Sequence, residues 1–319
     1  MQCRSGDRGA RDARFRFALT AVLSTVSSVA LAEAPATAVR AFNQYAATAE
    51  ARLARQHQAP ESFIASQNSA AQTRPRRGEQ IIENLSPTGD ADPAGALLHH
   101  WRGTAFVPGV TAEDFEQLMK NFDAYPQHFA PHVTRAKILS PYSGPIPDQF
   151  IASMRVRQTH VITVVMDTTD EVNFGRLDAS HGYSISRSTR IDEISSPGTP
   201  KEHALPPTEE HGFLWRLNTY WSYEERDGGL YMQIESISMT HEIPTGLGWA
   251  LRPYIESVPL ESLEFPLKAA AEALKRWDKH KGNNHSVRRA FSGSTLAARL
   301  AGTALAASAT SVTPATAIT

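Results

Sequence analysis

Two polar side chains interrupt an apolar stretch at the spacing of a β-strand, and they are the first candidates for chemistry in this chain. Between Phe150 and Val164, every second residue is apolar except Gln158 and His160. Alternate residues of a strand point to the same face of a sheet, so both polar groups are predicted to enter an apolar layer. Because buried polar groups are costly unless paired, they could hold the carbonyl, carboxylate or hydroxyl of a ligand.

Two arginines follow the same pattern on later predicted strands. Arg176 shares the parity of Val172 and Phe174, and Arg187 shares the parity of Tyr183 and Ile185. A guanidinium in such a place could bind a carboxylate or stabilise an oxyanion. The alternative for all four polar residues is a position at a strand end or turn, where parity does not decide burial.

Large aromatic residues form a third group of candidates. Trp215, Trp221 and Tyr223 alternate along one predicted strand and should face a helix that packs on the sheet. Most aromatic residues in such positions fill a core, but these three could also line a ligand chamber. The sequence leaves both interpretations open.

Common catalytic signatures are missing from the sequence. It has no nucleophile elbow, no phosphate-binding glycine loop and no zinc-protease helix signature. His128 and His132 flank Pro131, which spoils the helical geometry that would aim both at one ion, and His99 and His100 would point to opposite faces of a strand. We therefore expect no metal site and no cofactor.

Residues 211–277 give the clearest view of the elements that must position these side chains. Apolar residues alternate over 213–223 and again over 230–234, and the intervening sequence Arg226-Asp227-Gly228-Gly229 tolerates positive φ. This pattern predicts a half-buried strand, a tight turn and a returning strand.

The apolar phase of the returning strand slips to Ile237 and Met239. A slip by an odd number turns side chains to the other face, so we expect a bulge near Glu235 and Ser236. Such a bulge would curve the sheet.

An amphipathic helix is predicted after the hairpin, because apolar residues recur there at spacings of three and four. Its apolar stripe comprises Leu260, Leu263, Leu267, Ala270, Leu274 and Trp277. Upstream, a helix is predicted from a Thr111 cap, and further strands are predicted at 81–85, 97–107, 133–139, 149–165, 171–177 and 183–194. The fold class is therefore α+β, with a curved antiparallel sheet of about seven strands gripping a long C-terminal helix.

The segment Thr111 to Leu139, TAEDFEQLMKNFDAYPQHFAPHVTRAKIL, resembles the START-like, polyketide-cyclase-like (SRPBCC) superfamily, which has the helix-grip fold. The matching positions of its helix, turn and returning strand are Asp123, Tyr125, Pro126, Phe129, Pro131 and Val133. The resemblance covers about residues 95–277. These residues are structural in the family, so they identify the fold and not a reaction.

The resemblance implies a deep, largely apolar cavity between the sheet and the long helix. Members of the family bind lipids, sterols, polyketides or quinones there, and some are enzymes. The start of the helix and nearby loops form the mouth of the cavity in the family, so Trp249 and Tyr254 could gate entry, although the adjacent glycines could simply mark the helix start.

The two ends of the chain suggest export and contain segments that lie outside the folded domain. Residues 1–32 combine arginines, an apolar run and small residues in the layout of a secretory signal peptide. Residues 33–79 are predicted to form an exposed amphipathic helix and a linker, residues 80–280 the helix-grip domain, and residues 281–319 a disordered Ala/Ser/Thr-rich tail. We therefore expect an exported protein of periplasmic or extracellular location, with no stable membrane span after cleavage. A retained N-terminal anchor is the alternative.

Composition restricts the partners. Removal of residues 1–32 takes away the only cysteine, five arginines and two aspartates, which leaves 27 basic and 31 acidic side chains and a formal charge of −4. This charge argues against nucleic acid as a partner and leaves the oligomeric state open.

Three functions fit the sequence. The first is an exported binding protein for a hydrophobic small molecule, lipid or polyketide-like. The second is a cyclase, dehydratase or hydrolase with His160 as general base and Arg187 or Arg176 at an oxyanion. The third is an interaction module of the cell envelope that uses the two terminal extensions.

Overall fold

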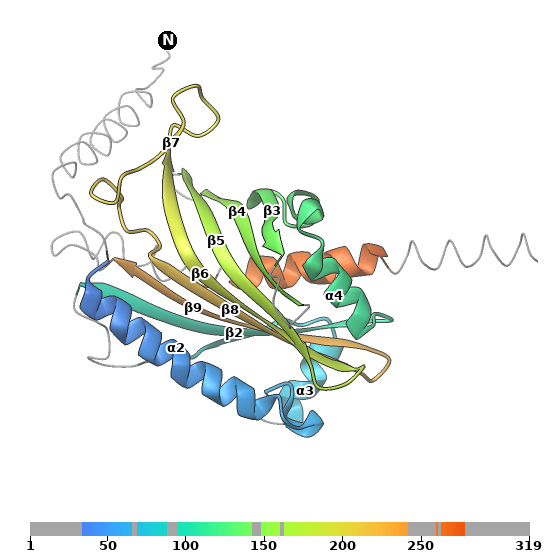
Figure 1. Ribbon diagram of the computed structural model, residues 1–319. Helices are drawn as coiled ribbons and strands as arrows, with labels where there is room; N and C mark the ends of the chain where they lie inside the picture. The colour runs from blue at the N-terminus through green and yellow to red at the C-terminus, as the bar shows by residue number, and fades with distance from the viewer. Residues whose placement is uncertain are drawn as a thin grey trace, which may run out of the picture.

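The protein folds as a curved antiparallel sheet with helices on both faces (Figure 1). The computed structural model describes residues 34–65, 69–87, 95–141, 148–159, 163–241, 260 and 263–277. The strands are β1 Ile81–Asn84, β2 Ala96–Pro108, β3 Val133–Pro141, β4 Gln149–Thr159, β5 Thr163–Arg176, β6 His181–Ser195, β7 His203–Ala204, β8 Arg216–Arg226 and β9 Gly229–His241. The helices are α2 Ala36–Gln56, α3 Ser69–Arg76, α4 Ala112–Lys120 and α5 Tyr125–His128, followed by a C-terminal helix over residues 263–277.

The strands lie in the order β1-β2-β9-β8-β6-β5-β4-β3, and the short β7 pairs with β6. This gives nine strands where about seven were expected. The predicted hairpin is confirmed as β8 and β9, and its turn places Asp227 at φ 56° and Gly228 at φ 74°. Two residues with positive φ match the right-handed twist of a two-residue hairpin.

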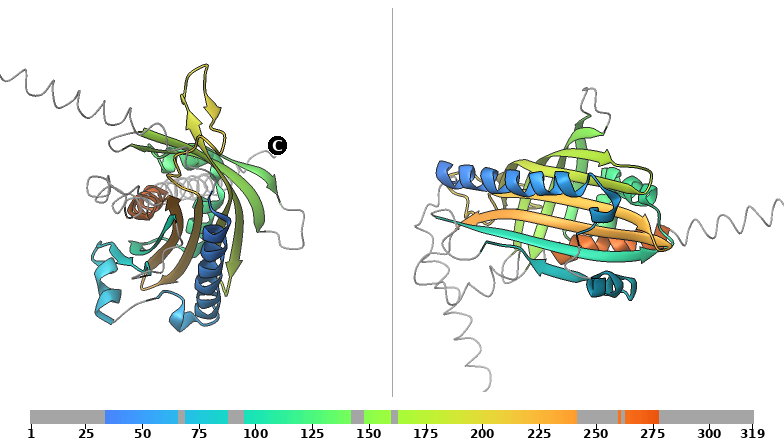
Figure 2. Two further views of the ribbon diagram at one scale, coloured as in Figure 1. Left: turned by 90° about the vertical axis from the view of Figure 1, so that its left-hand side faces the viewer. Right: turned by 90° about the horizontal axis from the view of Figure 1, so that it is seen from below.

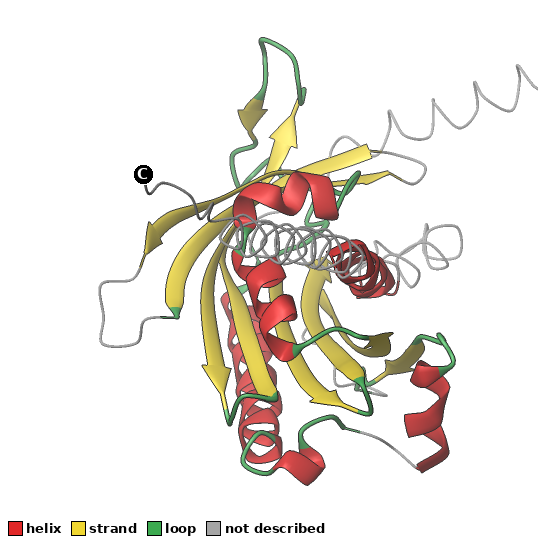
Figure 3. Ribbon diagram, turned by 90° about the vertical axis from the view of Figure 1, so that its right-hand side faces the viewer, coloured by secondary structure: helices red, strands yellow, loops and turns green. Residues whose placement is uncertain are grey.

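The C-terminal helix lies along one face of the sheet, which curves around it (Figure 3). We call this the inner face. The predicted stripe is confirmed, because Leu263, Leu267, Ala270 and Leu274 are fully buried. Gly103 on β2 permits the close approach, since a Cβ there would lie 2.8 Å from a Leu263 methyl group. The predicted helix-grip arrangement is therefore present.

Helix α2 covers the opposite, outer face of the sheet (Figure 2). It was expected to be exposed, which is wrong. Its apolar side is buried against β2, β8 and β9, through Ala38, Phe42, Ala46, Ala49 and Leu53. Residues 69–76 were expected to belong to a linker and instead form α3. The outer layer explains why β8 is buried on both faces and not half-buried as expected.

The predicted bulge near Glu235 and Ser236 is absent, because β9 pairs with β8 and β2 in an unbroken register. The apolar phase changes because the strand contributes to two cores. Leu230, Met232 and Ile234 pack on the inner face, whereas Ile237 and Met239 pack beneath α2. Register shifts occur instead between β3 and β4 and between β5 and β6.

The predicted strand over residues 149–165 is two strands. β4 ends at Thr159 and β5 begins at Thr163, and the two pair with each other as a hairpin. Parity therefore cannot be carried from Gln158 to His160.

Several predictions fall outside the described residues. They concern the signal peptide, the C-terminal tail, His160, Trp249 and Tyr254. Within the described ranges, no helix is both long enough and apolar enough to cross a membrane.

Candidate functional site

The inner face of the sheet is divided into an apolar part and a polar part. In the apolar part, Trp221 and Tyr223 on β8 are buried against Phe115 of α4, with ring centroids 5.3 and 4.8 Å from its ring. The capping box between Thr111 and Asp114 fixes the start of α4 and so places Phe115. Trp221 and Tyr223 therefore fill a core here.

The polar part begins at Thr219, two residues before Trp221 on β8. Val172 belongs to the inner core and pairs with Ser186, which pairs with Thr219. Thr219 in turn pairs with Ser236, and Ser236 pairs with Trp101. Directly paired residues share a face, so Ser186, Thr219 and Ser236 form a row of hydroxyl groups across three adjacent strands. We call these three residues the hydroxyl row; each is partly exposed.

Asp170 lies beside this row on β5. It pairs with Ala152, an inner-core residue, and only 3% of its surface is exposed. Among the residues that the structure describes, its one hydrogen-bond partner is the Thr168 hydroxyl, which donates to Oδ2 at 2.7 Å. Burial raises the pKa of Asp170 to about 6, and the hydrogen bond from Thr168 only partly opposes this.

Asp170 was not among the predicted site residues, although its signal is present in the sequence. The parity of Arg176, Phe174 and Val172 extends by one further step to Asp170. A carboxyl group on an apolar face is as strong a candidate for ligand binding as the arginine.

Arg176 ends the same strand, but it is occupied by an acidic partner. Its Nε donates to Glu116 Oε2 on α4 at 2.7 Å, and Lys120 donates to the other oxygen of Glu116 at 2.7 Å. The Tyr223 hydroxyl also donates to Glu116, at 3.0 Å. Burial alone would raise the pKa of Glu116, but these hydrogen bonds hold it below its usual value. The cluster fastens α4 to the sheet.

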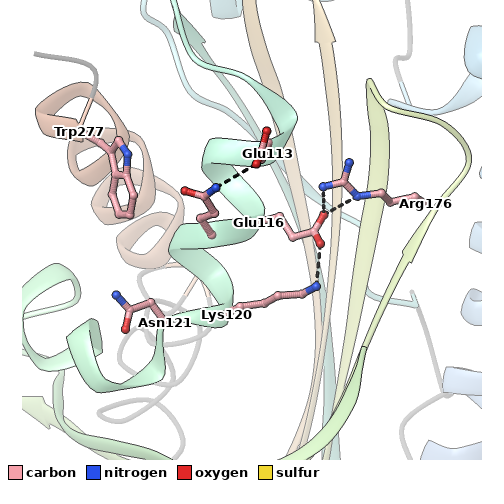
Figure 4. Close-up of a pocket in the computed structure, with 7 residues that line it drawn as sticks. Glu113, Glu116, Lys120, Asn121, Arg176 and Trp277 are labelled. Carbon is pink, nitrogen blue, oxygen red and sulfur yellow. Dashed lines mark hydrogen bonds and ion pairs between the residues drawn. The ribbon is translucent and has the colours of Figure 1, made fainter. Parts of the chain in front are cut away.

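A surface pocket of about 540 Å³ lies beside this cluster, between α4 and the C-terminal helix (Figure 4). It is lined by Glu113, Glu116, Gln117, Lys120, Asn121, Arg176 and Trp277. Most of these side chains are polar or charged, and Figure 4 shows the Arg176 and Lys120 side chains directed at Glu116. This pocket is unlike the apolar chamber that the resemblance implied.

Arg187 lies on the outer face and not in the layer beneath the C-terminal helix. Its guanidinium donates to both carboxylate oxygens of Glu50 on α2, at 2.7 and 2.8 Å, and the Tyr220 hydroxyl donates to the same carboxylate at 3.0 Å. Arg176 and Arg187 thus lie on opposite faces of the sheet. The catalytic hypothesis that used Arg187 within the inner layer is wrong, because parity alone could not say which face each strand turned inward.

The remaining predicted residues are placed as follows. Trp215 precedes β8 and packs in the core beneath α2, so it does not join Trp221 and Tyr223 as expected. Gln158 lies near the end of β4, paired with Val164, and is partly exposed. Across the residues that the structure describes, no group of three or more acidic, histidine or cysteine side chains is arranged to hold a metal ion.

The sequence matches no protein-family model and no curated protein. Similar solved structures include a START superfamily protein from Mycobacterium smegmatis, which is 16% identical with a TM-score of 0.37 and covers 56% of this chain and 98% of its own. The Zhui aromatase/cyclase from Streptomyces sp. R1128 is 13% identical with a TM-score of 0.40, over 56% of this chain and 95% of its own. A STAR-related lipid transfer protein from Xanthomonas axonopodis is 12% identical with a TM-score of 0.38, over 61% and 98%.

Proposed function

We propose that the protein binds a small hydrophobic molecule that also carries a hydrogen-bonding group, on the polar part of the inner face. The observation that carries this proposal is the hydroxyl row, which continues a packed apolar core without a break in the sheet. Hydroxyl groups both donate and accept hydrogen bonds, so they can orient a ligand of either kind.

Apolar neighbours of the hydroxyl row can supply most of the binding free energy. Leu217 and Trp101 are partly exposed and present apolar surface beside the hydroxyl groups, and the buried Val172 borders the row on β5. Each ligand methylene that leaves water contributes about 0.8 kcal/mol, so an acyl or ring system can supply most of the affinity. A few polar groups then fix its orientation, as in most small-molecule sites.

The test is to purify the full chain, extract it with organic solvent and identify small molecules by mass spectrometry. Affinity for the extracted compound is then compared between the natural chain and a Thr219→Val/Ser236→Ala variant, which removes two hydroxyl groups with little change in volume. We expect the variant to bind roughly 5- to 150-fold more weakly, since each of the two lost hydrogen bonds is worth about 0.5–1.5 kcal/mol.

Asn43→Ala is the matched control, because Asn43 is exposed on α2 at the outer face. It should bind like the natural chain. Absence of any extractable hydrophobic compound, together with no binding of the neutral probe N-phenyl-1-naphthylamine, would contradict the proposal.

Export is a second part of the proposal, and residues 1–32 support it through their signal-peptide layout. When the full chain is produced in a bacterial host, we expect it in the periplasmic or extracellular fraction. Its mass should be that of a chain that begins at Glu33. Recovery of the uncut chain from the membrane fraction would favour an anchor instead.

A further inference from the structure

The buried acidic residues of the described ranges differ in how their charge is balanced. They are Asp114, Glu116, Asp170, Glu193, Glu224 and Glu235. Four of these have basic partners: Lys120 and Arg176 for Glu116, His211 for Glu193, His181 and Arg226 for Glu224, and Arg52, His100 and Arg102 for Glu235. Asp114 accepts from the backbone N–H of Thr111 at the start of α4.

Asp170 has neither kind of partner among the residues that the structure describes. Within the described residues, its only hydrogen-bond partner is the hydroxyl of Thr168. Its neighbours on the paired strands are Ala152 and Ser188, so no charged or titratable side chain faces it from either side in the register. The nearby arginine and glutamate, Arg187 and Glu171, belong to the outer face.

A carboxylate without a cation is costly in such a place, because desolvation is not repaid by any ion pair. The raised pKa of Asp170 reports this cost. A cationic group on a bound molecule would supply the missing countercharge. The hydroxyl row offers further acceptors beside Asp170. Ser186 lies two residues from Ser188, the β6 partner of Asp170, and Thr219 pairs with Ser186.

We infer that the ligand is an amphipathic amine, whose protonated nitrogen pairs with Asp170 while its apolar part lies along the inner face. An ammonium group has three donors, which suits one carboxylate together with neighbouring hydroxyl oxygens. This inference rests on the proposed function and specifies the polar group of its ligand.

The experiment compares three twelve-carbon molecules on the full chain at pH 7.5, through displacement of N-phenyl-1-naphthylamine below micellar concentrations. These are dodecylamine, 1-dodecanol and dodecanoate. We expect the amine to bind at least about tenfold more tightly than the alcohol and the carboxylate to bind most weakly, because charge-assisted hydrogen bonds are stronger than neutral ones.

Asp170→Asn should remove the preference for the amine and leave the alcohol affinity within about twofold, since the amide keeps the shape and can accept from Thr168. Glu171→Gln removes the same charge one residue away, at an exposed position on the other face, and should leave the preference intact. Circular dichroism confirms that both variants fold.

Equal binding of amine and alcohol, or an unchanged preference in Asp170→Asn, would overturn the inference and leave the proposed function standing. If none of the three molecules binds and the probe does not bind, the proposed function itself fails.

Discussion

The imidazole of His100 and the carboxylate of Glu235 meet between the sheet and helix α2, with Nε2 3.0 Å from Oε2. The two residues are only 4% and 1% exposed. Arg52 of α2 donates to the same carboxylate oxygen, and the Tyr45 hydroxyl lies 2.9 Å from the other ring nitrogen of His100. The outer layer is therefore held by a buried ionic network as well as by apolar packing.

Removal of Glu235 should strongly destabilise the protein. Glu235→Ala leaves Arg52, His100 and Arg102 without their shared acceptor, and loss of one member of a buried ion pair typically costs about 3–5 kcal/mol. Urea unfolding measures the change. Glu79→Ala removes an exposed pair with Arg74 and should cost at most about 1 kcal/mol. Similar losses for the two variants would show that the network adds little.

Phe42 tests whether α2 belongs to the folded unit. Its ring is buried against the outer face of the sheet, so Phe42→Ala should lower the free energy of unfolding by about 3–5 kcal/mol. Asn43→Ala changes an exposed neighbour on the same helix and should have an effect within about 0.5 kcal/mol. A single cooperative transition that is unaffected by Phe42→Ala would mean that α2 is dispensable.

Gly103 tests the contact between the sheet and the C-terminal helix. Gly103→Ala places a methyl group 2.8 Å from Leu263 and 3.0 Å from Leu267, and such overpacking should cost about 1–3 kcal/mol. In a Leu263→Ala background the added methyl group has room, so the cost should shrink. A double-mutant cycle by thermal or urea unfolding checks this, and strictly additive losses would contradict the contact.

Asp170 should make stability depend on pH. Its pKa rises from 3.8 in the unfolded chain to about 6 in the folded one. Between these values the unfolded state loses its proton and the folded state keeps it, so the free energy of unfolding falls as pH rises from about 4 to 6. The total loss is on the order of 3 kcal/mol above pH 6.

The Asp170→Asn variant lacks this loss. Its stability relative to the natural chain should therefore increase by a similar amount between pH 3.5 and 7, measured by urea unfolding at each pH. Glu171→Gln controls for removal of a charge. A difference between Asp170→Asn and the natural chain that does not change with pH would show that the carboxyl group of Asp170 is not desolvated.

Much of the fold could be predicted because local sequence patterns determine it. The turn at Asp227 and Gly228, the cap at Thr111 and the stripe of the C-terminal helix each follow from a few neighbouring residues. The turn after Thr159 escaped detection because the segment 149–165 contains no glycine or proline and its alternation appears to continue.

The outer layer and the candidate site were harder to predict for a different reason. Polar residues such as Ser222 and Glu235 look like a solvent-facing side of a strand, but their partners, His57 and Arg52, lie on or next to a helix more than 160 residues away in the sequence. No local pattern reports such pairing. The same limit applies to Arg187, whose acceptor Glu50 also belongs to α2.

The division of β9 between two cores limits how far the chain can be shortened. A chain trimmed to begin near residue 80 would keep every strand and the C-terminal helix, yet it would uncover Leu98, Tyr220, Ile237 and Met239 together. Such an exposed apolar face favours self-association over solubility. The amino-terminal helix thus acts as an intramolecular shield for the sheet, and a minimal helix-grip unit cut from this protein should aggregate.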